Sequence, residues 1–180
     1  MTSLQSNDFE LFDLPARFAQ DRAAIDARWK ALQREAHPDR FAAEDATAQR
    51  LALQWSVRIN EAYQRLKDPQ KRAAYLCELN GSPIAAHTNT SMPGAFLMLQ
   101  MSWREALEDA SGVDELEAIG TLAQSYKKLA LARIEAGVDL EHDYTAAAGE
   151  VRALMFVEKF LAEVHTRIEQ AENAAAAKGQ

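Results

Sequence analysis

Apolar residues recur through most of the chain at the three- and four-residue spacing of an α-helix. Between residues 21 and 36, for example, they are Ile25, Trp29, Leu32 and Ala36. This spacing places side chains on one stripe of a helix, whereas a strand would alternate them between two faces. Composition agrees, because alanine occurs 35 times while valine, isoleucine and threonine together occur 19 times. Alanine favours helices and β-branched residues favour strands, so the sequence predicts an all-α protein.

Turn-forming residues divide this helical pattern into segments. Helices are expected at residues 9–14, 21–36, 44–66, 68–79, 95–111, 114–136 and 143–172. Four aspartates stand where helix N-caps are expected: Asp21, Asp68, Asp114 and Asp143. Residues 80–94 are rich in Gly, Pro, Ser, Asn and Thr, which is typical of an irregular connection. We therefore predict two helical modules, residues 1–79 and 95–180, joined by this linker.

The net charge of −7 is distributed unevenly between the two modules. Residues 1–80 carry 12 basic and 12 acidic side chains, whereas residues 81–180 carry 8 basic and 15 acidic ones. A nucleic-acid-binding protein needs a net basic surface to neutralise phosphates. The charge distribution therefore argues against nucleic acid as a partner.

Membrane and secretory signals are absent from the sequence. No apolar run approaches the roughly 18 residues that a membrane span needs. The N-terminal residues MTSLQSNDFE contain neither the basic nor the apolar region of a signal peptide. The single cysteine, Cys77, cannot form an internal disulfide. We expect a cytoplasmic protein in a reducing environment, without membrane attachment.

Patterns typical of catalytic or metal sites are also missing. The four histidines are widely separated, at His37, His87, His142 and His165. There is no HExxH pair, no GxxxxGK phosphate loop and no GxSxG elbow. The sequence therefore predicts no catalytic residues, no metal site and no cofactor, and favours a protein that binds other proteins.

The sharpest local feature is the tripeptide His37-Pro38-Asp39 between two amphipathic helices. Proline fixes its own φ angle, so the flanking His37 and Asp39 side chains are held in a rigid turn where a partner can contact them. Lys30 and Arg34 lie four residues apart on the helix face opposite the apolar stripe. An ordinary Asx-type turn between two helices is the alternative interpretation.

In this context, residues 8–76 resemble a J-domain, the module by which DnaJ-type co-chaperones engage the ATPase of a heat-shock chaperone. The resemblance includes the later segment INEAYQRLKDP, residues 59–69. It implies a helical hairpin with an HPD loop and short flanking helices, which docks on the nucleotide-binding domain of the chaperone and accelerates ATP hydrolysis. The implied docking residues are His37, Pro38 and Asp39, with Lys30, Arg34 and Arg40 as charge partners. Ala36 departs from the family, which often has tyrosine there.

The predicted helix at 95–111 carries two apolar stripes. The stripe expected to face the core consists of Phe96, Leu99, Trp103, Ala106, Leu107 and Ala110. The second consists of Leu97, Met98 and Met101, and acidic residues continue it. A helix in a small bundle has one face to bury, so the second stripe predicts an interaction surface. A helix central enough to bury both sides is the alternative.

Nearly the whole chain, including the second module, resembles the HscB family of bacterial iron–sulfur co-chaperones. The similar segments are Asp8-Phe9, Arg72–Leu76, Met92-Pro93, Phe96–Glu105 and Val151–Phe156. The resemblance implies a C-terminal three-helix bundle that binds an IscU-type Fe–S scaffold protein and delivers it to an HscA-type chaperone, whose ATPase both partners stimulate. The implied scaffold-binding residues are Leu97, Met98, Met101, Glu105, Asp109 and Phe156.

Three positions in the predicted helix at 95–111 depart from the family pattern. Met101 replaces a frequent leucine of similar volume, Ser102 replaces a glutamate, and Leu99 replaces a polar residue. The resemblance implies an adaptor for iron–sulfur cluster biogenesis, and we expect this adaptor to be monomeric and non-catalytic. A J-domain co-chaperone of a general chaperone with unrelated clients is the first alternative, and a helical enzyme is the second.

Overall fold

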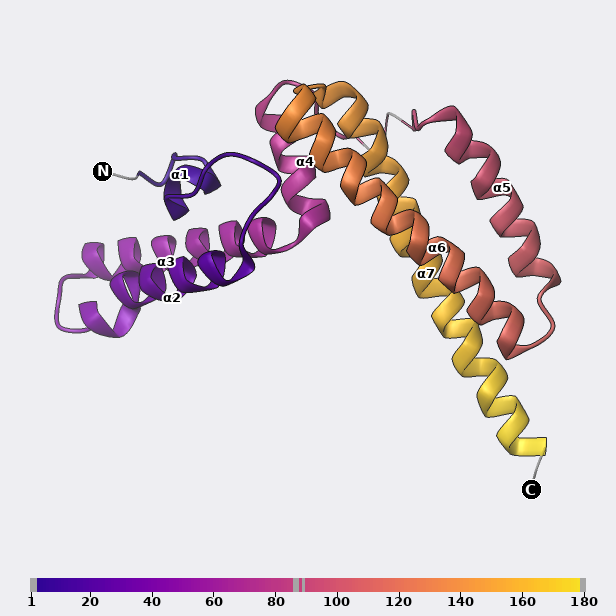
Figure 1. Ribbon diagram of the computed structural model, residues 1–180. Helices are drawn as coiled ribbons and strands as arrows, with labels where there is room; N and C mark the ends of the chain where they lie inside the picture. Colours follow the sequence, from indigo (N-terminus) through magenta and orange to yellow (C-terminus); the bar gives the residue numbers. More distant parts are fainter. Residues whose placement is uncertain (1–2, 86–87, 89, 179–180) are drawn as a thin grey trace. The chain divides into compact units, whose positions relative to one another are not determined.

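The computed structural model describes residues 3–85, 88 and 90–178, and every regular element in these ranges is helical. The elements are α1 (Asp8–Phe12), α2 (Arg22–Ala36), the 3₁₀ helix η1 (Pro38–Phe41), α3 (Ala46–Lys67), α4 (Pro69–Leu79), α5 (Gly94–Asp109), α6 (Val113–Glu135), the π-helical turn η2 (Ala136–Glu141) and α7 (Tyr144–Lys178) (Figure 1). The all-α prediction is confirmed. The chain divides into two compact units, Met1–Leu76 and Cys77–Gln180.

The domain limits predicted at residues 79 and 94 remain predictions. The division between the two compact units falls after Leu76, within α4. Residues 86, 87 and 89 of the predicted linker, which include His87, lie outside the described residues. On the C-terminal side of α4, the buried Arg152 of α7 donates hydrogen bonds to the Ser91 and Ile84 carbonyls. The described ends of the linker are therefore held against the second unit.

The first unit is built on the α2–α3 hairpin, whose helices lie side by side (Figure 1). Ile25 on α2 and Ile59 on α3 are fully buried, as the apolar periodicity predicts. The short α1 contributes Phe9 and Phe12, which are also buried. Because each helix buries only one stripe, the opposite faces of α2 and α3 remain available to solvent.

A buried carboxylate ties α1 to the rest of this unit. Asp8 is fully buried, and its two oxygens lie 2.7 Å from Arg58 Nη2 and 3.3 Å from Arg65 Nε, both on α3. These contacts are ionic and are not well-aligned hydrogen bonds. The backbone N–H of Asp8 donates a hydrogen bond to the Tyr75 hydroxyl of α4, at 3.1 Å. One residue therefore connects three helices.

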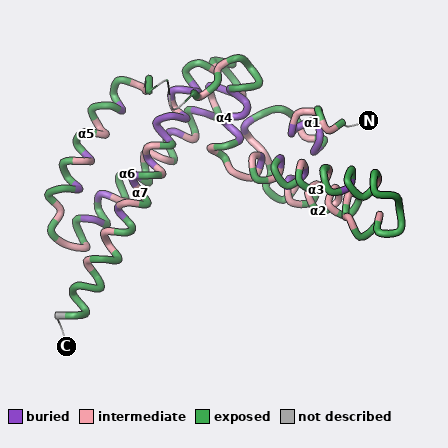
Figure 2. Tube along the Cα trace, turned by 180° about the vertical axis from the view of Figure 1, so that it is seen from behind, coloured by how far each residue is buried: buried purple, intermediate pink, exposed green. Residues whose placement is uncertain are grey.

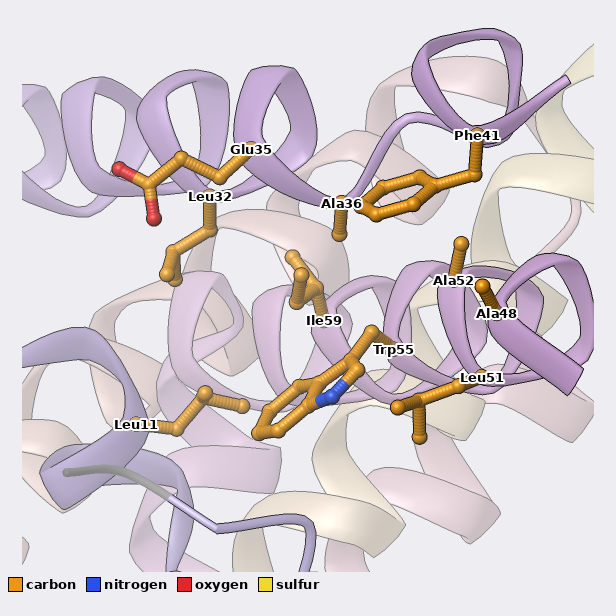
Figure 3. Close-up of a pocket in the computed structure, with 10 residues that line it drawn as sticks. All are labelled: Leu11, Leu32, Glu35, Ala36, Phe41, Ala48, Leu51, Ala52, Trp55 and Ile59. Carbon is orange, nitrogen blue, oxygen red and sulfur yellow. The ribbon is translucent and has the colours of Figure 1, made fainter. Parts of the chain in front are cut away.

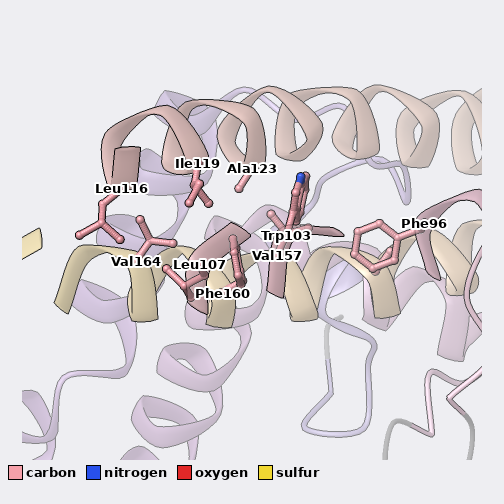
Figure 4. Packing of buried hydrophobic residues seen from close by; sticks show 10 residues of the cluster. Phe96, Trp103, Leu107, Leu116, Ile119, Ala123, Val157, Phe160 and Val164 are labelled. Carbon is pink, nitrogen blue, oxygen red and sulfur yellow. The ribbon is translucent and has the colours of Figure 1, made fainter. Parts of the chain in front are cut away.

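In the second unit, α6 and α7 pack along each other, and α5 contacts this pair through aromatic rings (Figure 4). The Phe96 ring lies 4.8 Å from the Tyr126 ring of α6, and the Trp103 ring is stacked 5.5 Å from the Phe160 ring of α7. These large side chains fill the space between α5 and its neighbours. The aromatic layer consequently helps to orient α5, together with the Arg104–Glu163 ion pair and the hydrogen bond from Arg167 to the Leu107 carbonyl.

Helix α6 begins differently from the prediction. It begins at Val113 after Gly112, so Asp114 is a first-turn residue and not the N-cap. The Glu115 carboxylate reaches back and accepts hydrogen bonds from the backbone N–H and the hydroxyl of Ser111, at 2.7 and 3.1 Å. These bonds lower the pKa of Glu115. Glu115 thus provides the hydrogen-bond acceptor for Ser111, just before the start of this helix.

Two other helix ends also differ from the prediction. Gly137 does not end α6, because it lies buried inside η2, where an added Cβ would stand 3.5 Å from the Ala147 Cβ. Helix α7 continues to Lys178, where the sequence predicted fraying after residue 172. The alanines at 174–177 are strong helix formers, which accounts for the longer helix. The N-cap predicted at Asp143 is confirmed by its hydrogen bond from the Ala146 N–H, at 2.9 Å.

The buried position of Asp8 predicts a specific loss of stability. Replacing Asp8 with Asn removes the charge but little volume, and leaves two partly buried guanidinium groups without their counter-ion. We expect the free energy of unfolding to fall by about 2–3 kcal/mol in urea titrations. The matched control is Asp13→Asn, because Asp13 is 85% exposed and 3.8 Å from Arg28. It should change stability by less than about 0.5 kcal/mol, and an equal loss in both variants would contradict the role of Asp8.

Candidate functional sites

The HPD turn is built by the abrupt end of α2. The residue before a proline is disfavoured in the helical conformation, and His37 accordingly adopts φ −63° and ψ 126° as the C-cap. The backbone N–H of Asp39 donates a hydrogen bond to His37 Nδ1, at 3.3 Å. With Nδ1 as an acceptor, the neutral imidazole carries its proton on Nε2. The His37 side chain is 54% exposed and the Asp39 side chain is 89% exposed. The turn is therefore accessible to a partner as well as ordered by its hydrogen bond.

The basic residues near the turn fall into two groups. Lys30 and Arg34 are exposed on α2, and both line a shallow depression beside Trp29. Arg40 instead folds back, and its Nη1 donates a hydrogen bond to the Arg34 carbonyl at 3.1 Å. A cation there also complements the negative C-terminal end of the α2 dipole. The structure therefore gives Arg40 a role in ordering the turn.

An apolar cavity of about 330 Å³ lies under the turn, between α2 and α3 (Figure 3). The cavity is lined by Leu11, Leu32, Glu35, Ala36, Phe41, Ala48, Leu51, Ala52, Trp55 and Ile59. Ala36 presents only a methyl group to it, and the Phe41 ring lies beside that methyl group (Figure 3). The position where the sequence departs from the family pattern thus lines unfilled space, and packing beneath the turn comes from Phe41.

The outer surface of α5 is exposed as the second apolar stripe predicts. Leu97, Met98 and Met101 are 45%, 70% and 68% exposed, and Glu105 and Asp109 are exposed beyond them. Helix α5 therefore does not bury both sides (Figure 2), and that alternative is wrong. We refer to these five residues as the α5 surface.

The opposite stripe of α5 is buried in most of its predicted positions. Phe96, Trp103 and Leu107 are buried, and Leu99 packs partly buried against the same core. Ala106 is exposed, so its predicted place in the core is wrong. Since Leu99 is a core contact, its departure from the family pattern affects packing, whereas Ser102 is exposed.

Phe156 differs from the other predicted scaffold-binding residues because it is part of the aromatic core. It is partly buried, and its ring lies 5.6 Å from that of Phe96 and 5.9 Å from that of Phe160. The Arg104 guanidinium lies over this ring at 5.4 Å and is paired with Glu163 at 2.5 Å. Phe156 thus supports the second unit as well as being a candidate contact.

Arg104 is a neighbour of the α5 surface that the sequence reasoning missed. It lies seven residues after Leu97 and three after Met101, a spacing that places all three on one side of a helix. The helical spacing could have found it, although its ion pair with α7 could not be read from α5 alone. The apolar stripe is therefore bordered by a paired cation as well as by carboxylates.

Other chemistry is limited in the part of the chain that the structure describes. Over 3–85, 88 and 90–178 there is no group of three or more His, Cys, Asp or Glu side chains placed to hold a metal ion. None of the described helices is long and apolar enough to cross a membrane. Cys77 is buried, and burial raises the pKa of its thiol to about 11. The thiol is therefore protonated and unreactive at neutral pH.

Similarity to known proteins follows nearly the full length of the chain. A family model described as "HSCB C-terminal oligomerisation domain" matches residues 92–165. The "Co-chaperone protein HscB homolog" of Burkholderia mallei is 48% identical over 176 residues, which cover 96% of this chain and 100% of that protein. The chain belongs to the HscB co-chaperone family. A protein of the same name from Paraburkholderia phytofirmans is 46% identical over 177 residues, with the same coverage.

Solved structures of HscB proteins share the fold. Chaperone HscB from Vibrio cholerae superimposes with a TM-score of 0.77 at 34% identity, over 92% of this chain and 99% of that chain. The human co-chaperone protein HscB gives a TM-score of 0.84 at 23% identity, over 92% and 84%, and supports the fold alone. The predicted fold class, an N-terminal J-domain and a C-terminal helical bundle, is confirmed. The assignments of individual binding residues remain predictions.

The different surroundings of Met98 and Phe156 predict different effects on stability. Met98→Ala removes a mostly exposed side chain and should change the free energy of unfolding by less than about 0.5 kcal/mol. Phe156→Ala removes ring contacts with Phe96, Phe160 and Arg104, and should lower it by about 1–3 kcal/mol. Urea titrations of both variants would measure this. Equal stability of the two variants would contradict the packed position of Phe156.

Proposed function

We propose that this HscB-family chain binds an IscU-type Fe–S scaffold protein and delivers it to an HscA-type heat-shock chaperone, whose ATPase it stimulates through the HPD motif. The observation that carries the proposal is the ordered, exposed turn of His37, Pro38 and Asp39. This turn occurs in a chain that matches proteins named co-chaperones along their full length. The chain acts as an adaptor, with no catalytic step of its own.

The chaperone contact uses the HPD turn and the exposed side of α2. The turn is already held by Pro38 and by the Asp39–His37 hydrogen bond, so little conformational entropy is lost when a partner binds. Lys30 and Arg34 supply positive charge beside it, which suits an acidic surface on the chaperone and accelerates encounter at low salt. Arg40 contributes mainly by ordering the turn.

The scaffold contact uses the α5 surface together with Phe156. Leu97, Met98 and Met101 provide an apolar centre, and Glu105 and Asp109 provide an acidic border. Apolar residues at the centre of an interface carry most of the binding free energy, whereas exposed ion pairs contribute roughly 0–1 kcal/mol. The matching scaffold surface is therefore an apolar patch bordered by basic residues.

Delivery follows from having the two contacts in one chain. The HPD turn belongs to the first compact unit and the α5 surface to the second. A scaffold held on one unit experiences a raised effective concentration at the chaperone engaged by the other. The adaptor thus promotes capture of the scaffold without any covalent chemistry.

The alternative is a co-chaperone of a general chaperone with unrelated clients. Co-purification of an Fe–S scaffold would favour the first function. The deciding experiment is ATPase stimulation of the cognate HscA-type chaperone with and without the scaffold; the proposal predicts stimulation by the chain alone and a further increase when scaffold is added. We expect a cytoplasmic monomer, and sedimentation would test the monomer against the "oligomerisation domain" in the family model's description.

The HPD motif predicts a variant that folds but does not stimulate. His37→Gln removes the imidazole from an exposed turn, so circular dichroism should be unchanged. Single-turnover ATP hydrolysis by the chaperone should fall to the rate measured without the co-chaperone. The matched control is His165→Gln, because His165 is an exposed histidine on α7 paired with Glu169. Full stimulation by the His37 variant would refute the central role of the turn.

The apolar centre of the α5 surface predicts a ranking of scaffold affinities. Leu97→Ala and Met98→Ala should each raise the Kd measured by calorimetry at least about tenfold, whereas Glu105→Ala should raise it less than about fivefold. Phe156→Ala should also weaken binding more than Glu105→Ala, after correction for the unfolded fraction. Leu140→Ala is the control, because Leu140 is 77% exposed and lies outside this surface. A larger effect of Glu105→Ala than of the apolar variants would contradict the ranking.

A further inference from the structure

Two methionines stand out on the α5 surface because their side chains are more exposed than those of the other described methionines. Met98 and Met101 are 70% and 68% exposed and lie three residues apart, on one side of α5. Met155 on α7 is 38% exposed, and Met92 is partly buried against the aromatic core. A dissolved oxidant therefore reaches Met98 and Met101 more readily than Met92 or Met155.

The only thiol of the chain does not compete for such an oxidant. Cys77 is fully buried, and its raised pKa leaves almost no thiolate at neutral pH. Oxidants attack cysteine as the thiolate, so burial and protonation both protect this residue. Sensitivity to oxidation in the folded protein consequently rests on methionine sulfur.

We infer that Met98 and Met101 form a peroxide-sensitive modification site, and that their oxidation to methionine sulfoxide releases the scaffold protein. This inference rests on the proposed scaffold-binding function of the α5 surface and adds a form of regulation to it. The modification is reversible, because methionine sulfoxide reductases restore the thioether.

The chemistry requires only hydrogen peroxide as co-reactant. The thioether sulfur attacks one peroxide oxygen, so that an S–O bond forms while the O–O bond breaks. The proton on the transferred oxygen passes to the departing oxygen, which leaves as water. The sulfur is oxidised by two electrons and the peroxide is reduced by two electrons, so the step is balanced for each methionine.

The position of the two sulfurs explains why binding is lost while the fold is kept. The core side of α5 is formed by Phe96, Trp103 and Leu107, so a polar oxygen on Met98 or Met101 lies outside the core and mostly in solvent in the free protein. In the complex the same oxygen lies at the apolar centre of the interface, where an unsatisfied polar group is unfavourable. Binding of the scaffold should also shield both sulfurs from peroxide.

The test oxidises this chain alone, before any partner is added. The full-length protein is treated with hydrogen peroxide, the peroxide is removed with catalase, and oxygen addition is mapped by peptide mass spectrometry. Binding to untreated IscU-type scaffold is then measured by calorimetry. We expect Met98 and Met101 to gain oxygen before Met92 and Met155, circular dichroism to be unchanged, and the Kd to rise at least about tenfold. Methionine sulfoxide reductase should restore the affinity.

Two double variants assign the effect to these residues, each compared with its own untreated sample. Met92→Leu/Met155→Leu leaves the proposed site intact and should lose affinity on treatment as the wild type does. Met98→Leu/Met101→Leu should keep its own untreated affinity after treatment. If this variant binds too weakly to measure, the first variant alone decides.

The outcomes separate this inference from the proposed function. Unchanged affinity of the oxidised wild type, or of oxidised Met92→Leu/Met155→Leu, would overturn the inference and leave the scaffold-binding function standing. Loss of the folded state at the degree of oxidation that weakens binding would also overturn it. If the untreated wild type does not bind the scaffold, the proposed function and the inference both fail.

Discussion

The aromatic layer between α5 and the α6–α7 pair determines which residues of the second unit face outward. Phe96 and Trp103 contact rings on both neighbouring helices, so rotation of α5 about its axis would separate several ring pairs at once. Because this orientation is fixed from the inside, the outward direction of Leu97 and Met98 does not depend on any contact of their own. The α5 surface can thus vary in sequence while the core holds its position.

In the first unit, a proline determines which residues face outward. Pro38 begins the 3₁₀ helix η1 directly after α2, with His37 as the cap residue between them and Asp39 inside η1, while Phe41 packs over the apolar space beside Ala36. At the other end of the unit, Asp8 holds α1 against α3. Both units therefore combine a packed interior with an exposed surface, proposed above for binding, whose side chains contribute little to stability.

The features that the sequence predicted correctly are those that depend on one helix at a time. The end of α2 at Ala36, the HPD turn and the exposure of Met98 and Met101 follow from periodicity and proline geometry. The missed features depend on neighbouring helices. Periodicity placed Ala106 in the core, although the structure leaves it exposed, and the resemblance that implied Phe156 as a contact did not show that its ring packs against Phe96 and Phe160. The sequence predicted that a helix ends at Gly137. This prediction was wrong because the glycine lies inside η2 and close to Ala147, a tertiary contact that the local sequence does not show.

The folded-back position of Arg40 has a consequence for the interpretation of charge-removal experiments. Its guanidinium is bonded to the α2 backbone, so removing it would broaden the range of conformations that the turn samples. A loss of chaperone stimulation would then come from disorder in the free protein, and its dependence on ionic strength would match that of the wild type. Under the proposed chaperone contact, removal of Lys30 or Arg34 would instead flatten the dependence of stimulation on ionic strength, because salt screens exposed charges that attract a partner. Salt titration thus distinguishes a residue that shapes the turn from residues that attract the partner.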